Sequence, residues 1–194
     1  MEIATEMFVG GHPALDFVNT AGGSTKVRDK DRLVELGDAI DWALAVELLA
    51  PEEALTLRGA RDTDATLDRL REQREALHAY LSAAALGEEP DAAARSRVEA
   101  DVRGAYACAR LSGRPGEPDV WTVPMAEAGV DVLAHRIALT TATLLTSADA
   151  KAVRVCQACS WLYLDLSPTR RRRWCSMATC GNRAKARRHR AKQP

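Results

Sequence analysis

The sequence predicts a mainly helical α+β fold, in which a helical domain over residues 1–150 precedes a small cysteine-rich module over residues 151–194. Apolar residues recur at helical spacing through most of the first part. A turn rich in Gly and Pro, near residue 115, separates two short apolar stretches. Four of the five cysteines lie between residues 156 and 180. The junction between the two parts is expected at residues 151–153.

Helices are expected over most of the N-terminal part. The longest ends at Gly87, and its apolar residues recur on one face: Thr63–Leu86, with Leu67, Leu70, Leu77 and Leu81. A second helix is expected over the apolar stretch from Leu33 to Leu48, and Asp31 can cap its start. Gly37-Asp38 could divide this helix in two. The remaining predicted helices are His12–Asn19, Pro51–Gly59, Asp91–Arg103 and Val130–Ser147.

A small β-hairpin is predicted between the last two of these helices. Its strands are Ala105–Leu111 and Val120–Val123, because the turn-forming residues 112–118 lie between them. Cys108 would then lie on an apolar strand as a core residue, separate from the other four cysteines.

The charge of the chain is divided sharply between its two parts. The formal net charge is zero, but residues 151–194 hold 12 Lys and Arg against the single acid Asp165, and residues 1–150 carry the compensating excess of acids. Such asymmetry is typical of an acidic body with an appendage that binds polyanions. A disordered basic tail is the alternative.

Nothing in the sequence indicates export or membrane insertion. The N-terminus lacks the basic start and apolar core of a signal peptide, and the most apolar stretches are short or interrupted by acids. We therefore expect a cytoplasmic, nucleoid-associated protein with no membrane partner. In a reducing compartment, a cysteine cluster is more often a metal site than a set of disulfides.

The four clustered cysteines have the spacing of a metal site, C-x2-C-x15-C-x4-C. Two close pairs, Cys156 with Cys159 and Cys175 with Cys180, can converge on one tetrahedral ion. Since four sulfurs fill the coordination sphere, the expected cofactor is one structural Zn²⁺ per chain, which would also stabilise a module too small to fold alone. Disulfides, unrelated buried thiols and an iron–sulfur cluster are the alternatives.

Basic residues flank the second cysteine pair and form the candidate nucleic-acid surface. The basic residues after Cys180 would form two stripes on a helix, and these stripes could bind phosphates. Trp161, Tyr163 and Trp174 either pack inside the module or stack on bases. The basic candidates are Arg170, Arg171, Arg172, Arg173, Arg183, Lys185, Arg187, Arg188, Arg190 and Lys192.

The segment from Arg172 to Lys185, with Cys-Gly-Asn-Arg at residues 180–183, resembles the CGNR zinc finger. Residues 156–166 resemble the first knuckle and strand of that family, with Ser160 where the family usually has glycine. The resemblance implies zinc on Cys156, Cys159, Cys175 and Cys180. It also implies a nucleic-acid role for the helix that begins at residues 181–183, which adds Asn182 to the candidates, and we expect a treble-clef-like module.

Residues 11–20 are similar to the opening of the ABATE-type domain that precedes this finger in stress-induced bacterial transcription regulators. The resemblance rests on Leu15-Asp16-Phe17 and Asn19-Thr20. Polar residues in this segment could line a ligand pocket, or they could cap and end a helix. The candidates are His12, Asp16, Asn19 and Thr20.

The function favoured by these features is a one-component transcription regulator. Its helical domain would respond to a small-molecule effector or a stress signal, its finger would bind double-stranded DNA, and a homodimer would double the contacts. RNA or nonspecific nucleic-acid binding and recruitment of a protein are the alternatives. No enzyme is expected, because His12, His78 and His135 lie in no nucleophile or metal motif.

Overall fold

Three long helices form the centre of the fold: α4 (Thr63–Leu86), α5 (Ala92–Cys108) and α7 (Val132–Thr146). The computed structural model describes residues 8–113, 116 and 118–191, and in it α5 packs against both of the other two. The other elements, in chain order, are α1 (Pro13–Val18), α2 (Leu36–Ala45), α3 (Pro51–Arg58), β1 (Arg110–Ser112), β2 (Val120–Thr122), α6 (Met125–Ala128), η2 (Gly129–Asp131), η3 (Ala148–Ala152), β3 (Val153–Val155), β4 (Leu162–Leu164), η4 (Met177–Gly181) and α8 (Asn182–Arg190).

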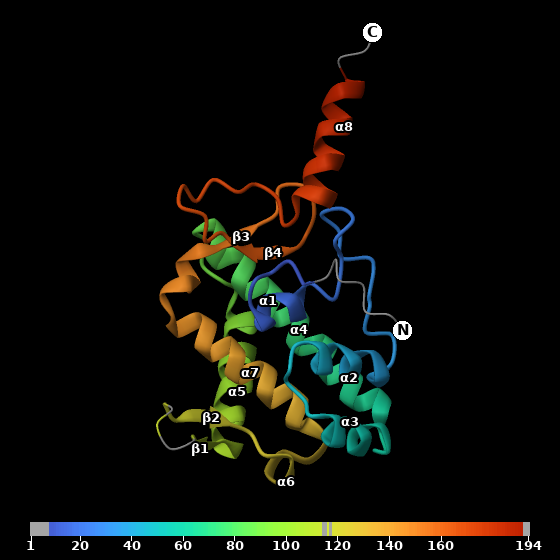
Figure 1. Cartoon of the computed structure of the whole chain (residues 1–194), viewed down its shortest axis with the longest axis vertical. Helices are drawn as coiled ribbons and strands as arrows, with labels where there is room; N and C mark the ends of the chain where they lie inside the picture. Colours follow the sequence, from blue (N-terminus) through green and yellow to red (C-terminus); the bar gives the residue numbers. More distant parts are fainter. Residues whose placement is uncertain (1–7, 114–115, 117, 192–194) are drawn as a thin grey trace.

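The elements are distributed toward the two ends of the central helices. The antiparallel pair β3–β4 lies at one end, and the antiparallel hairpin β1–β2 lies at the other with α6 (Figure 1). Helix α8 extends beyond the body at the β3–β4 end (Figure 1). The fold is mainly helical with small antiparallel strand pairs, which confirms the predicted class.

The core follows from the apolar periodicity of the helices. The leucines of α4 at 67, 70, 77 and 81 are all buried, as are Leu133, Ile137 and Leu144 of α7. In α1 the ring of Phe17 lies 5.4 Å from that of Trp42 in α2, centroid to centroid. Helix α4 has the predicted bounds and ends at Gly87, whose φ of 76° only glycine adopts without strain. Helices α1, α3 and α7 also lie where the sequence predicts them.

The first strand of the predicted hairpin was placed too early in the chain. Residues 105–108 continue α5, and only Arg110–Ser112 form β1. Ala105 is fully buried within the helix, and α5 packs along α7. Tertiary packing therefore outweighs the local preference for a strand. Cys108 ends the helix, partly buried and outside the cluster of the other four cysteines.

The helix expected after Asp31 begins later than predicted, at Leu36, and is not divided at Gly37-Asp38. The Asp38 carboxylate accepts hydrogen bonds from the backbone N–H groups of Val34 and Glu35, at 2.8 and 3.0 Å. Asp31 instead accepts a hydrogen bond from the N–H of Leu33 and pairs with Arg74. A long-range ion pair thus removes Asp31 from the capping role that its sequence position suggests.

One helical stretch among the described residues, Met125–Thr146, is long and apolar enough by composition to cross a membrane. This is weak evidence for a span, because core helices meet the same criterion. Helix α7 within this stretch buries eight of its residues, and it packs against α1 and α5. Its apolar character therefore has a sufficient explanation in the core.

The C-terminal segment packs directly on the helical body. The Asn19 side chain at the end of α1 donates a hydrogen bond to the carbonyl of Leu162 and accepts one from its N–H, both at 2.9 Å. The indole N–H of Trp161 donates to the carbonyl of Ala21, at 3.0 Å. The predicted boundary at residue 150 falls within η3, a short 3₁₀ helix between α7 and β3. Both parts of the chain contribute to one continuous hydrophobic core.

Candidate metal centre and nucleic-acid interface

The first cysteine pair lies on the turn between β3 and β4. The two strands pair antiparallel with Val155 opposite Leu162, and the backbone N–H of Cys156 donates to the carbonyl of Trp161 at 2.9 Å. The turn is closed further by the N–H of Ala158, which lies 3.5 Å from the Cys156 sulfur. A tight turn of this kind directs the sulfurs of Cys156 and Cys159 to the same side.

The second pair lies at the start of α8. Cys175 precedes η4, a single π-helical turn, and Cys180 lies within that turn. The Ser176 hydroxyl accepts a hydrogen bond from the N–H of Thr179, and the carbonyl of Ser176 accepts one from Gly181. The turn therefore holds Cys180 directly before the N-terminus of α8.

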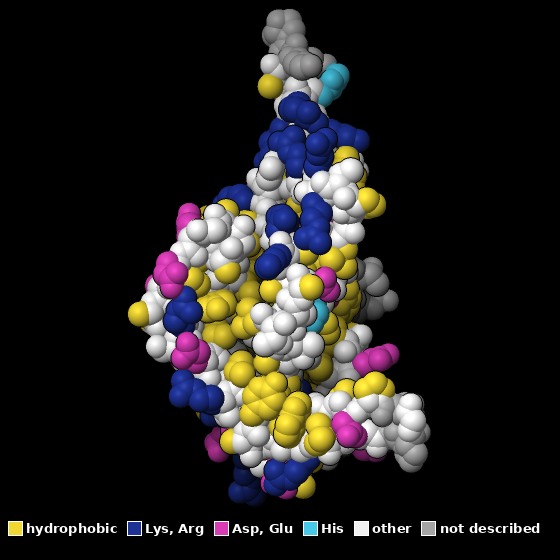
Figure 2. Space-filling model, turned by 90° about the vertical axis from the view of Figure 1, so that its left-hand side faces the viewer, with side chains coloured by type: hydrophobic (Ala, Val, Ile, Leu, Met, Phe, Trp, Pro, Cys, Tyr) yellow, Lys and Arg dark blue, Asp and Glu magenta, His cyan; other side chains and the backbone are white. Residues whose placement is uncertain are grey.

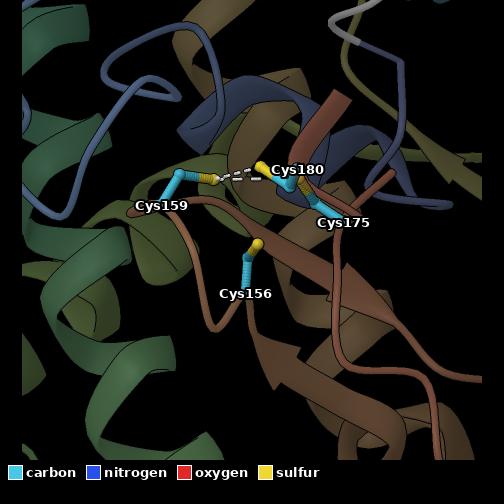
Figure 3. A group of neighbouring side chains, drawn as sticks. All are labelled: Cys156, Cys159, Cys175 and Cys180. Carbon is cyan, nitrogen blue, oxygen red and sulfur yellow. Dashed lines mark hydrogen bonds between the residues drawn. The ribbon is translucent and has the colours of Figure 1, made fainter. Parts of the chain in front are cut away.

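The four sulfurs converge on one point (Figure 3). All four ligand atoms lie within 4.8 Å of one another, and three of their separations are 3.7 Å (Cys159–Cys175), 3.6 Å (Cys175–Cys180) and 3.5 Å (Cys180–Cys159). A tetrahedral ion with metal–sulfur bonds of ~2.3 Å requires sulfurs about 3.8 Å apart. The separations are far longer than a disulfide bond and leave room for one ion rather than a multi-iron cluster.

The environment of these cysteines suits a structural metal ion. All four are buried, and none is in a disulfide. Hydrogen bonds from the thiols of Cys159 and Cys175 lower the pKa of Cys156 well below its usual range. The ordinary pKa of a thiol is near 8.5, so a divalent ion completes the deprotonation of the set. With four sulfur ligands, no position remains for a catalytic water.

Arg183 links the metal centre to the helical body. Its guanidinium donates to the sulfur of Cys180 at 2.8 Å, to the carbonyl of Ser24 at 2.9 Å and to the carbonyl of Gly23 at 3.0 Å. The hydrogen bond to Cys180 raises the pKa of Arg183. Four thiolates around a divalent ion carry a net charge of −2, which a neighbouring cation offsets. Sequence reasoning assigned Arg183 to nucleic acid and missed this role.

The predicted basic residues separate into two groups. Arg172 lies over the ring of Tyr163 at 4.5 Å and donates to the carbonyl of Trp174, Arg173 donates to Gln157, and Asn182 donates to Ala178. Together with Arg183, these side chains serve contacts within the chain. The side chains of the other group are exposed and make no ion pair or hydrogen bond with the described residues: Arg170, Arg171, Lys185, Arg187, Arg188 and Arg190. Lys192 lies outside the described residues.

The exposed cations gather at the projecting end of the molecule. Helix α8 has no buried residue and no acid, and Figure 2 shows Lys and Arg side chains grouped on it. The single acid of the module, Asp165, is buried and accepts hydrogen bonds from Ser167 and from the backbone N–H of Arg172. The Ser167 hydrogen bond lowers the pKa of Asp165. No acid among the described residues of the module therefore neutralises the positive charge of α8.

Two family comparisons cover almost the whole chain. Residues 152–193 match the CGNR zinc finger, and residues 11–148 match the ABATE family, described as "putative stress-induced transcription regulator". The chain belongs to the ABATE family. No curated protein matches it at a significant level. The four cysteines lie within the CGNR zinc finger and form its site for one structural zinc ion, which confirms the cofactor expected from the sequence.

Ser160, the departure from the CGNR pattern, makes contacts that glycine could not make in full. Its hydroxyl accepts a hydrogen bond from Gly23 at 3.3 Å, its N–H donates to Thr25 at 2.8 Å, and its carbonyl lies 2.8 Å from a ring nitrogen of His78. Its φ is not in the left-handed region, so the turn does not require glycine. Trp161 and Tyr163 are buried and pack within the structure, as one of the two interpretations predicted.

The four polar residues near α1 have contacts inside the ABATE domain. His12 caps α1 by accepting from the N–H of Ala14, and Asp16 accepts from the N–H of Gly10 at 2.8 Å. Burial lowers the pKa of His12 and raises that of Asp16 to about 6. Asn19 and Thr20 are fully buried, and the Thr20 hydroxyl donates to the carbonyl of Phe17. Two cavities of about 290 and 190 Å³ in the described part of the chain are lined by other residues. These contacts are those expected of residues that cap and end a helix, and a ligand-binding role for the four residues stays a prediction.

Proposed function

We propose that the protein is a one-component transcription regulator whose CGNR zinc finger binds double-stranded DNA through α8. The observation that carries the proposal is a set of exposed cations on and beside this helix whose side chains pair with none of the described residues: Arg170, Arg171, Lys185, Arg187, Arg188 and Arg190. Side chains of one sign on a projecting helix repel one another. Phosphates relieve that repulsion and release counterions when they bind.

The shape of α8 favours duplex DNA over duplex RNA. The helix has nine residues, about 14 Å in length, and no face is used by the core. The major groove of B-DNA is about 12 Å wide and admits an α-helix, whereas the major groove of A-form RNA is too narrow for side chains to read. Arginine can also pair bidentately with guanine, so the helix is able to read sequence as well as bind phosphates.

The remaining parts of the proposal concern regulation and assembly. The ABATE domain would respond to a small-molecule effector or stress signal in the cytoplasm, and the protein would associate with the nucleoid and have no catalytic activity. A nine-residue helix covers only part of the ~1,000–2,500 Å² that specific protein–DNA interfaces bury. We therefore propose a homodimer, in which two fingers bind adjacent half-sites.

The test is fluorescence-anisotropy titration of labelled duplex DNA, duplex RNA and single-stranded RNA across a series of salt concentrations. Replacing Arg187 and Arg188 by Gln should lower affinity for DNA and reduce the slope of log K against log salt by about 1.8, because each phosphate contact contributes ~0.9. The matched control replaces Arg61 and Arg103, two exposed arginines of the body, and should leave the slope unchanged.

Each arm can contradict the proposal. Preferred binding of either RNA would replace DNA with RNA as the partner. Equal binding of every nucleic acid would make the contact nonspecific. If zinc-stripped protein bound DNA as well as the zinc-loaded protein, the finger would not be the binding element. If the α8 double variant retained wild-type salt dependence, the basic residues would be available for a protein partner instead.

A further inference from the structure

The loop of residues 22–30, in the ABATE domain, lies against the finger at the base of α8. Figure 1 shows it in blue beside the start of that helix. The backbone N–H of Ser160 in the finger donates to the carbonyl of Thr25 at 2.8 Å. The guanidinium of Arg183, in the first turn of α8, donates to two carbonyls of the loop at 2.9 and 3.0 Å. These contacts place a segment of the helical body directly beside the candidate DNA-binding helix.

The 22–30 loop is also held in one conformation by contacts with its own body. The backbone N–H of Gly22 donates to the carbonyl of Lys30 at 2.7 Å, which joins the two ends of the loop. Arg28 donates to the carbonyl of Val18 at 2.8 Å and pairs with Glu75 of α4 at 2.7 Å. A loop that is already ordered loses little conformational entropy when a partner binds to it, which favours a role in recognition.

Residues 24–26 of this loop are at least partly exposed and carry hydrogen-bond donors that are not used within the chain as described. Their backbone N–H groups and the hydroxyl of Ser24 bond to none of the described residues. The Thr25 hydroxyl accepts one backbone hydrogen bond and keeps its own proton for another acceptor. The Lys26 ammonium donates to a backbone carbonyl of the finger, and its remaining N–H groups are available. Lysines, hydroxyls and backbone N–H groups are the donors that bind phosphate oxygens in protein–DNA complexes.

A row of arginines on α8 continues from this loop along the helix. Residues four and seven apart share one face of a helix, so Arg187 and Arg190 lie on the same side of α8 as Arg183, which contacts the loop. At 1.5 Å per residue, they follow Arg183 by roughly 6 and 10 Å along the helix axis. A DNA backbone that follows this row therefore reaches the 22–30 loop at the base of the helix.

The exposed charges of the loop leave it with a positive excess. Lys26 and Lys30 are both exposed, and the Lys30 ammonium pairs with no residue in the described part of the chain. The charge of Arg28 is offset by Glu75. The acid of the loop, Asp29, is exposed and opposes the approach of an anion. Its carboxylate therefore provides a charge of the opposite sign with which a phosphate contact can be tested.

We propose that the 22–30 loop is a second DNA contact, in which its lysines and hydroxyl groups bind the phosphate backbone beside the groove that α8 occupies. The inference rests on the proposed function and adds to it a contact made by the ABATE domain itself. A nine-residue helix buries little surface by itself, and the loop extends the interface onto the helical body. Because Arg28 ties the loop to α4, the affinity for DNA then depends on the body as well as on the finger.

A cross-linking experiment tests the contact directly, with zinc-loaded full-length protein and labelled duplex DNA of mixed sequence. Phosphate contacts support nonspecific binding, so the target sequence is not required. A benzophenone amino acid placed at Val27, which is 63% exposed on the loop, should cross-link to the duplex. The same group at Leu55, which is 71% exposed on α3 and away from α8 (Figure 1), should not. No cross-link at Val27, or equal cross-linking at both positions, would overturn the inference.

Charge variants measure the contribution of the loop in anisotropy titrations across a series of salt concentrations. Lys26→Gln and Lys30→Gln should each reduce the slope of log K against log salt by ~0.9 and weaken binding about fivefold at roughly 0.15 M salt. Asp29→Asn should strengthen binding, because it removes a charge that repels phosphate. The matched control is Arg61→Gln, which removes an exposed charge that pairs with no described residue and precedes α4. This control should leave the slope unchanged.

The two lysine variants separate a lost phosphate contact from a damaged finger. Lys26→Gln also removes a hydrogen bond to the carbonyl of Cys156, so its zinc content and melting temperature are measured alongside. Lys30→Gln removes no side-chain contact with the described residues, and its slope decides the outcome if the Lys26 variant loses zinc. If replacing Arg187 and Arg188 weakens binding while Lys30→Gln keeps the wild-type slope, the inference falls and the proposed function stands. If the wild type binds no duplex DNA, the proposed function falls and the inference falls with it.

Discussion

Replacement of Asn19 by Ala should destabilise the whole protein, because this side chain joins the helical body to the finger. Asn19 is fully buried, and its amide makes two hydrogen bonds of 2.9 Å with the backbone of Leu162. Alanine would leave the N–H and the carbonyl of Leu162 without these partners, in a region that excludes water. Each unpaired buried group costs ~1–3 kcal/mol, so the expected loss is about 2–6 kcal/mol.

That loss is large against the ~5–15 kcal/mol by which domains of this kind are stable. The matched control is Asn182→Ala. Asn182 is exposed at the start of α8 and donates one hydrogen bond, to the carbonyl of Ala178 at 3.0 Å. Its replacement removes a solvated hydrogen bond and adds helix propensity, so the free energy of unfolding should change by less than ~0.5 kcal/mol.

The assay is urea unfolding with saturating zinc and a reductant, followed by far-ultraviolet circular dichroism and by tryptophan fluorescence. Tryptophans lie in both parts of the chain, at positions 42, 121, 161 and 174. A shared core predicts that both signals change together and that Asn19→Ala moves the single midpoint. Two separate transitions in the wild type, or equal stability of the two alanine variants, would refute the reasoning.

Three further predictions concern charge, metal and sterics. Burial raises the pKa of Asp16 to about 6 from 3.8, so ionisation of this carboxyl destabilises the fold as the pH rises from about 4 to 6. In urea titrations, the free energy of unfolding of Asp16→Asn should equal that of the wild type below pH 4 and exceed it by up to ~3 kcal/mol at pH 7.5. Equal free energies of unfolding at all pH values would contradict this. Elemental analysis should find one zinc per chain. Chelation of this zinc should lower the melting temperature of the helical body as well as that of the finger, because the two share a core. An unchanged melting temperature after complete removal of zinc would contradict the shared core. Gly23→Ala should cost more stability than Gly87→Ala. Both glycines have positive φ, but only at Gly23 would the new Cβ meet a neighbour, 2.5 Å from the indole of Trp161. Similar melting temperatures of the two variants would show that this contact is not tight.

The features predicted correctly from the sequence depend on short stretches of chain. The leucines of α4 recur within one helix, and Gly87 ends it through its own backbone freedom. The first strand of the predicted hairpin shows where such local prediction fails. Residues 105–108 carry a local preference for a strand, yet they form the last turn of α5, where Ala105 is fully buried. A periodic pattern is decided locally, whereas a short apolar stretch takes its conformation from its neighbours.

The same division applies to the candidate site. The sequence by itself determined the four zinc ligands and the excess of positive charge, because thiolate chemistry and close spacing leave few other arrangements. Only the tertiary structure decided which cations are free. Arg183 is bound to residues 159 and 160 positions away, and Asn19 to a residue 143 positions away. Hydrogen bonds across such distances depend on how finished elements pack, and no local pattern of residue types records that packing.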